Sequence, residues 1–191
     1  DAKSSATIDK PTIRIIYQST SMVAMVSAFT NYANTPEIQR IPSSLNALVN
    51  KTVSLYDAQK GVRIDLDLSG DLPELHLDGD GISRVLINLI KNASEASKGQ
   101  EILNIIIRTR YQANDNIVRL TITDDGKGFP KGIIDQVFEP YITTKGKGSG
   151  LGLAIVQNII EQHDGQVHAS NIKPRGARVT IEFSIIDGAR S

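Results

Sequence analysis

Hydrophobic and polar positions alternate in several short stretches of the chain, which is the pattern of half-buried β-strands. Residues 62–68 alternate strictly, and a short strand is expected at 75–77, after a turn at 70–73. Turn residues at 114–116 and 174–176 each separate two further stretches, which predicts two hairpins. Their strands are expected at residues 102–110, 117–123, 166–172 and 178–186.

Apolar residues recur at helical spacing between these strands. Ser43 or Ser44 is expected to cap a helix that ends at Gly61, and further helices are expected at about 81–97 and from the glycines near 150 to about 162. A glycine-rich loop with one short helix is expected between them, at 126–149. Antiparallel strand pairs with helices between them predict an α/β (α+β) two-layer sandwich, in which helices cover a mixed, largely antiparallel sheet.

A long helix is expected before this sandwich, at about residues 12–34. Its apolar side carries a seven-residue repeat, the spacing of a coiled coil or a helical bundle, at Ile15, Met22 and Phe29. Packing of this face on the chain's own domain is the alternative. Pro36 and Pro42 interrupt the chain, so the sequence divides into a helical segment at 1–35, a hinge at 36–42 and a domain at 43–191.

Composition narrows the function classes. The 191 residues carry 21 basic and 21 acidic side chains, so the overall charge offers no attraction to nucleic acid. The chain has no cysteine, which excludes disulfides and thiolate metal sites. No apolar run approaches the roughly 20 residues that cross a bilayer, and the first residues match neither a signal peptide nor a start methionine. A fragment of a longer protein is expected.

The glycine-dense stretch at residues 145–152 passes directly into an apolar helix. Glycines let backbone N–H groups approach a ligand, and a helix N-terminus attracts anions. A phosphate site is therefore expected around Gly148, Gly150, Leu151 and Gly152, with Lys145 just before it. The spacing fits neither a Walker loop nor a Rossmann turn. Packing glycines, without a ligand, are the alternative.

Asn88 and Asn92 lie four residues apart on the predicted helix and so share one face, with Glu95 further along it. Amide oxygens are hard ligands that suit Mg²⁺ bridged to phosphates. The two asparagines are therefore candidate magnesium ligands. Two solvated surface side chains are the alternative.

A carboxylate and a glycine turn follow the predicted strand at 117–123. Asp124 can accept a hydrogen bond from the exocyclic amine of adenine, while Gly126 and Gly128 let the base lie against backbone. The stretch at 138–145 adds an aromatic side chain and ends at Lys145, a point charge for a phosphate. A plain tight turn and a solvated lysine are the alternatives.

Taken in order, four motifs resemble a known family. The runs N-L-I-K-N-A, D-D-G-K-G, F-E-P-Y-I-T-T-K and G-S-G-L-G-L are similar to the N box, first glycine box, F box and second glycine box of sensor histidine kinases. These kinases belong to the ATPase superfamily of gyrase and the heat-shock chaperones. The resemblance covers about residues 43–187.

The resemblance implies ATP and Mg²⁺ as cofactors. Asn88 and Asn92 would hold the metal and the phosphates, Asp124 would read adenine, and residues 129–147 would form the ATP lid. In the gyrase branch a glutamate that activates water stands at the position of Asn88. Because an amide cannot act as a base, phosphate is expected to go to a protein acceptor. Lys145 is the candidate catalytic residue.

The helix at 12–34 resembles the second helix of the dimerisation and phosphotransfer hairpin, most closely in nitrogen-regulation kinases of the NtrY type. The phosphorylated histidine of such kinases lies on the first hairpin helix, which this chain lacks. Its three histidines are expected to be structural: His76, His163 and His168. The fragment is therefore expected to bind ATP without labelling itself.

The family further implies a set of partners and a location. These are an acceptor helix of the same kinase, a response-regulator receiver domain, a homodimeric full-length protein and a cytoplasmic position in a membrane-bound sensor. Two other functions stay open at this point. One is a serine kinase or ATPase of the same superfamily, and the other is a nucleotide-gated interaction module without turnover.

Overall fold

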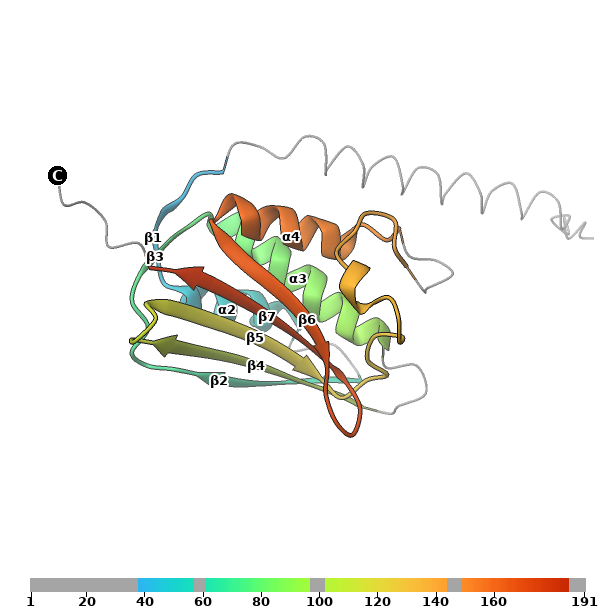
Figure 1. The fold of residues 1–191 in the computed structure, drawn as a ribbon. Helices are drawn as coiled ribbons and strands as arrows, with labels where there is room; N and C mark the ends of the chain where they lie inside the picture. The colour runs from blue at the N-terminus through green and yellow to red at the C-terminus, as the bar shows by residue number, and fades with distance from the viewer. Residues whose placement is uncertain (1–37, 57–60, 97–101, 144–148, 186–191) are drawn as a thin grey trace, which may run out of the picture.

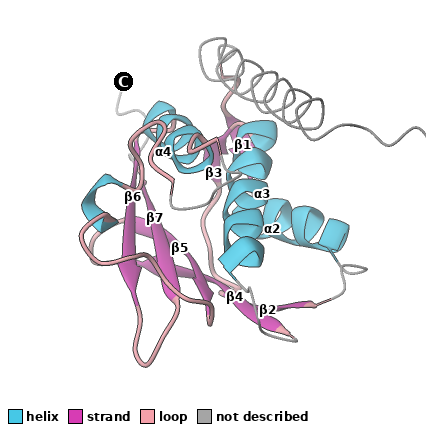
Figure 2. Cartoon of the chain, turned by 90° about the vertical axis from the view of Figure 1, so that its right-hand side faces the viewer, coloured by secondary structure: helices cyan, strands magenta, loops and turns pink. Residues whose placement is uncertain are grey.

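The computed structural model describes residues 38–56, 61–96, 102–143 and 149–185. A five-stranded sheet has the order β2-β4-β5-β7-β6, and α2, α3 and α4 cover one of its faces (Figures 1 and 2). Only β2 and β4 run parallel, and the other neighbours are antiparallel. The predicted two-layer sandwich with a mixed, largely antiparallel sheet is therefore confirmed. The expected helix at 12–34 lies outside the described residues.

The main sheet contains the strands that the alternation predicts. Their bounds are β2 Val62–Leu68, β4 Leu103–Gln112, β5 Ile117–Asp124, β6 Gly165–Asn171 and β7 Ala177–Ser184. Along β4, buried side chains alternate with more exposed ones from Leu103 to Arg110, and most of the buried side chains of β4 and β5 are apolar. The two hairpins β4–β5 and β6–β7 also form as expected.

Two short strands lie outside this sheet. β1 (Ile41–Ser43) pairs antiparallel with β3 (Leu75–Leu77). The sequence predicts β3, but it places Ile41 and Pro42 in the hinge, because proline usually interrupts regular structure. Pro42 lies opposite His76 in the two-stranded ladder, so the last two residues of the predicted hinge belong to a strand, while the hinge itself stays a prediction.

Local capping explains where the helices begin. The Ser44 hydroxyl accepts from the Ala47 N–H and starts α2 (Leu45–Val53), which a 3-10 turn, η1 (Ser54–Tyr56), follows. The Asp78 carboxylate accepts from the backbone N–H groups of Asp80 and Gly81 and so caps α3 (Gly79–Ala96). Between β5 and α4 (Gly152–Gln162), the described residues form one short 3-10 turn, η2 (Ile134–Gln136).

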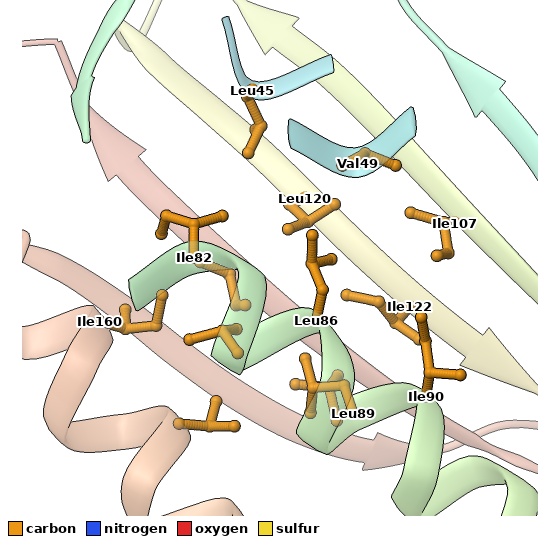
Figure 3. Packing of buried hydrophobic residues seen from close by; sticks show 14 of the residues in the cluster. Leu45, Val49, Ile82, Leu86, Leu89, Ile90, Ile107, Leu120, Ile122 and Ile160 are labelled. Atoms are coloured by element: carbon orange, nitrogen blue, oxygen red, sulfur yellow. The ribbon is translucent and has the colours of Figure 1, made fainter. Parts of the chain in front are cut away.

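One hydrophobic core lies between the helices and the sheet (Figure 3). It takes Leu45 and Val49 from α2, and α3 inserts Ile82, Leu86 and Ile90 against β4 and β5. These side chains are at most a few per cent exposed, and burial of each contributes roughly 1.5–3 kcal/mol. The core fixes α3 on the sheet, and the side of α3 next to its buried face borders a cavity.

Candidate nucleotide-binding site

A cavity of about 420 Å³ opens between α3, α4, the end of β5 and the segment that follows β5. Its inner wall is apolar and includes Leu89 and Ala93 of α3, Ile122 of β5 and Val179 of β7. Polar groups enter from two sides. Pockets for small ligands commonly span roughly 300–1,000 Å³ and combine apolar walls with a few polar groups, so the cavity suits a molecule of nucleotide size.

Asp124 forms one end of the cavity. It is the last residue of β5 and only 8% exposed. Its Oδ1 atom accepts hydrogen bonds from the backbone N–H of Gly126, at 2.8 Å, and from that of Ala177, at 3.4 Å. A carboxylate held by N–H groups from both sides has a fixed direction, which a residue that reads a base needs.

Asp125, the next residue, has a different environment. Its two carboxylate oxygens accept from the backbone N–H and the side-chain amide of Asn104, at 3.0 and 2.7 Å. Burial alone would raise the pKa of Asp125, but the bonds from Asn104 and the nearby charge of Arg175 outweigh it and lower the pKa. Asp125 does not line the cavity, so only the first of the two adjacent aspartates can contact a ligand there.

Asn88 and Asn92 border the cavity from α3, beside the first turn of α4. The Asn88 side-chain N–H donates a hydrogen bond to the backbone carbonyl of Arg84, at 2.8 Å. The Oδ1 atom of Asn88 therefore points away from that carbonyl. A Cβ added to Gly152 would lie 3.3 Å from that Oδ1 and 3.6 Å from Asn92 Nδ2. Both amides thus face the start of α4. Glu95 lines the cavity on the same side of α3.

Gly150 allows the glycine turn to lie close to the preceding segment. Its φ is +68°, and an added Cβ would lie 2.5 Å from the backbone of Tyr141. The Tyr141 N–H donates to the Gly150 carbonyl, at 3.0 Å. No side chain fits there, so glycine is required for this approach.

Of the remaining predicted site residues that the structure describes, some line the cavity and others do not. Gly128 lines the cavity, whereas Gly126 lies behind Asp124, where an added Cβ would come within 2.8 Å of Asp124 Oδ1. Leu151 is buried and does not line the cavity. Lys145 and Gly148 lie outside the described residues.

Sequence reasoning missed several cavity residues. Leu153 and Ile155 belong to the apolar helix that follows the glycine stretch, whose pattern predicts core positions, but they are half-buried and line the cavity. Phe138 packs against the core, and Phe129 supplies an aromatic lining instead. Arg84 lines the cavity too, and its place one turn before Asn88 is the signal that could have identified it.

The three histidines do not line the cavity. His76 and His168 are exposed on β3 and β6. His163 is buried at the end of α4, where Nε2 accepts from the Asp78 N–H, at 2.9 Å, and Nδ1 lies 2.7 Å from the Ile159 carbonyl. His163 therefore joins the end of α4 to the start of α3, which is a structural role.

A divalent cation has few protein ligands available here. Within the described ranges, no group of three or more His, Cys, Asp or Glu side chains is placed to hold a metal. Magnesium usually keeps several waters and binds through one or two protein groups plus substrate phosphates. The amide pair on α3 fits that kind of site and does not form a closed metal cage.

Residues 77–186 match the family described as histidine kinase-, DNA gyrase B- and HSP90-like ATPases. The chain belongs to this family. The matched range includes the whole lining of the cavity, and the domain is an ATP-binding domain of that class.

Curated relatives with similar sequences are named as sensor histidine kinases. The chain is 35% identical over 140 residues to sensor histidine kinase ZraS of Escherichia coli O157:H7, covering 72% of this chain and 30% of ZraS. It is 33% identical over 177 residues to a putative NtrY-like sensor histidine kinase of Rickettsia prowazekii, covering 90% of this chain and 28% of that protein. The chain thus spans less than a third of the length of these relatives.

Solved structures agree on the fold. The nucleotide-free catalytic domain of histidine kinase ThkA is 26% identical with a TM-score of 0.68, covering 77% of this chain and 96% of that domain. ThkA in complex with the response regulator TrrA matches with a TM-score of 0.73 at 22% identity, covering 95% of this chain and 52% of that one. The second likeness bears on the fold alone. Among the described residues, every helix is too short or too polar to cross a membrane.

Proposed function

We propose that this domain binds Mg-ATP and transfers the γ-phosphate to a histidine on an acceptor helix, as the catalytic part of a sensor histidine kinase. The observation that carries the proposal is one cavity with a fixed carboxylate at one end and two amides beside a helix N-terminus at the other. The two ends have different chemistry, which suits a ligand with a base and a phosphate chain.

Asp124 would accept a hydrogen bond from the exocyclic amine of adenine. The Gly126 and Ala177 N–H groups already hold its Oδ1 atom, which keeps the carboxylate in position without the ligand. Ile122 and Val179 would contact the faces of the base, since both are apolar and line the cavity. Gly128 lines this end of the cavity as well.

Asn88 and Asn92 would meet the phosphates and Mg²⁺ at the start of α4. The backbone N–H groups of this first helical turn have no partner within the helix, so they add anion-binding capacity. Arg84 adds a positive charge one turn further along α3. Lys145, Gly148 and Gly150 keep their proposed phosphate roles, and Leu151 anchors the turn through burial rather than by contact with the ligand.

The acceptor is proposed to be a protein side chain. An amide at position 88 cannot abstract a proton from water, which argues against efficient hydrolysis. The names of the curated relatives support a histidine acceptor. None of the three histidines of this chain borders the cavity, so the acceptor would come from a separate helix.

The wider assembly rests on the resemblance and on the relatives. Residues 1–35 would supply the second helix of the dimerisation and phosphotransfer hairpin, joined through the linker at 36–42 to the catalytic domain. ThkA has been solved with a response regulator, which supports a receiver domain as the next phosphate acceptor. A homodimeric full-length protein at the cytoplasmic side of a membrane-bound sensor, of the NtrY type, completes the proposal.

One experiment tests the transfer. The chain is incubated with Mg²⁺ and γ-labelled ATP, with and without a separate acceptor-helix domain from an NtrY-like kinase. We expect acid-labile phosphate on the acceptor domain and no label on the chain itself. Labelling of a chain histidine would contradict the proposed acceptor. ATP binding without any transfer would favour the nucleotide-gated interaction module, and release of free phosphate would favour an ATPase.

A further inference from the structure

The side chain of Asn171 bridges β6 to Phe129, in the segment that follows β5. Asn171 is the last residue of β6 and is exposed. Its Oδ1 atom accepts from the Phe129 N–H at 2.7 Å, and its Nδ2 atom donates to the Phe129 carbonyl at 2.8 Å. One amide therefore satisfies both backbone groups of Phe129, as a neighbouring strand would.

The backbone around this bridge is built to fit it. Gly128 has a φ of +72°, and an added Cβ would lie 2.6 Å from Asn171 Oδ1 and 2.9 Å from the Gly176 carbonyl. Any other residue at 128 would push the Asn171 amide away from Phe129. The glycine and the asparagine thus depend on each other.

The same strand pair also positions Asp124. Asn171 lies opposite Ala177 in the β6–β7 ladder, and the Ala177 N–H donates to Asp124 Oδ1. Gly128, Phe129 and Ala177 all line the cavity. The end of the β6–β7 hairpin therefore contacts both the Asp124 carboxylate and Phe129, at the same end of the cavity.

We infer that Asn171 is a positioning residue for nucleotide binding: it fixes Phe129 and Gly128 as the wall beside the base. This inference rests on the proposed function, because it assumes that the base lies at the Asp124 end. Asn171 itself does not line the cavity, so it acts through Phe129. Without the two hydrogen bonds of Asn171, Phe129 and Gly128 would have to become ordered when the ligand binds. The entropy cost of this ordering lowers the affinity.

The test compares Asn171→Ala with Asn104→Ala. Asn104 is a matched control, because its amide also bonds a residue just after β5, Asp125, but neither residue lines the cavity. Calorimetry would measure the affinities for Mg-ATP, Mg-ADP and adenosine. We expect Asn171→Ala to weaken all three by a similar factor, about tenfold for the loss of two partly exposed hydrogen bonds. Asn104→Ala should change each of the three affinities by less than about twofold.

Amide hydrogen exchange separates positioning from general destabilisation. In Asn171→Ala the Phe129 amide should exchange faster, while the amides of Val167 and Ile181 in β6 and β7 keep their protection. Unchanged affinity for all three ligands in Asn171→Ala would overturn the inference, as would equal loss of protection across the hairpin. Absence of ATP binding by the unmodified chain would instead contradict the proposed function, and the inference with it.

Discussion

The side-chain oxygen of Asn88 faces the first residue of α4, so closely that a Cβ on Gly152 would lie 3.3 Å from it. Asn88 comes from the middle of α3 and Gly152 from the end of the glycine turn, 64 positions later in the sequence. Because neither element alone forms a phosphate site, this approach of α3 to α4 is what brings the amides and the helix N-terminus together.

Gly152→Ala should weaken nucleotide binding without weakening the fold. The new methyl group presses on Asn88 and Asn92, and the loss of one good hydrogen bond to a charged phosphate corresponds to about tenfold in affinity. Alanine favours helix over glycine by up to about 1 kcal/mol, so the melting temperature should stay equal or rise. Gly70→Ala, where nothing lies within 4 Å of an added Cβ, is the control for binding. Unchanged Mg-ATP affinity in Gly152→Ala would exclude the proposed phosphate end.

Asp124→Asn should weaken ATP binding and reduce the preference for adenine. The change replaces one acceptor oxygen by an amide donor, and a mismatched buried hydrogen bond costs about 1–3 kcal/mol. Competition between ATP and GTP measures the preference, and Asp125→Asn is the neighbouring control, because Asp125 bonds Asn104 and does not line the cavity. Equal losses in the two variants would show that Asp124 has no special role.

Asp125 should make the stability of the fold depend on pH in acid. Its pKa is lowered from an ordinary value near 3.8, so its ionised form is favoured by folding. The resulting stabilisation is fully present above about pH 3.8 and is lost as the pH falls through the lower, folded-state value. Urea unfolding of the unmodified chain and of Asp125→Asn should therefore differ most near neutrality and converge in acid. A difference that grows on acidification would contradict the assigned bonds.

Arg84→Gln should lower the affinity for ATP more than that for ADP. Along α3, Arg84 lies one turn beyond Asn88 on the side away from Asp124, which is where the terminal phosphate is expected. Loss of one cation near the terminal phosphate should lower the affinity for ATP several-fold and leave the affinity for ADP nearly unchanged. Calorimetry with both nucleotides decides, and Lys51→Gln on the exposed side of α2 is a control for net charge. An equal loss for both nucleotides would place Arg84 elsewhere along the ligand.

The local pattern of the sequence was sufficient for most of the fold. Strict alternation identified β2, and turn residues identified both hairpins, because these signals depend on neighbouring residues. β1 was missed, since a three-residue strand containing Pro42 has no periodicity and forms only by pairing with distant β3. The parallel pairing of β2 with β4 likewise depends on contacts far apart in the chain.

The site was predictable where a motif carries the chemistry. Asn88, Asn92 and Asp124 belong to such motifs, and all three line the cavity. Ile155 was missed, because an apolar residue on a helix looks the same whether it faces core or ligand. Arg84 was missed because it lies outside the motif, although its place one turn before Asn88 puts it on the same helix face. Asn171 was beyond sequence reasoning, since its partner Phe129 lies 42 positions away.

A crystal structure with Mg²⁺ and a non-hydrolysable ATP analogue would show the direction in which the nucleotide lies. We expect the exocyclic amine of adenine within hydrogen-bond distance of the Asp124 carboxylate, and the phosphates with the metal between Asn88, Asn92 and the first turn of α4. A base lying beside Arg84, or a metal bound away from the two asparagines, would contradict this expectation.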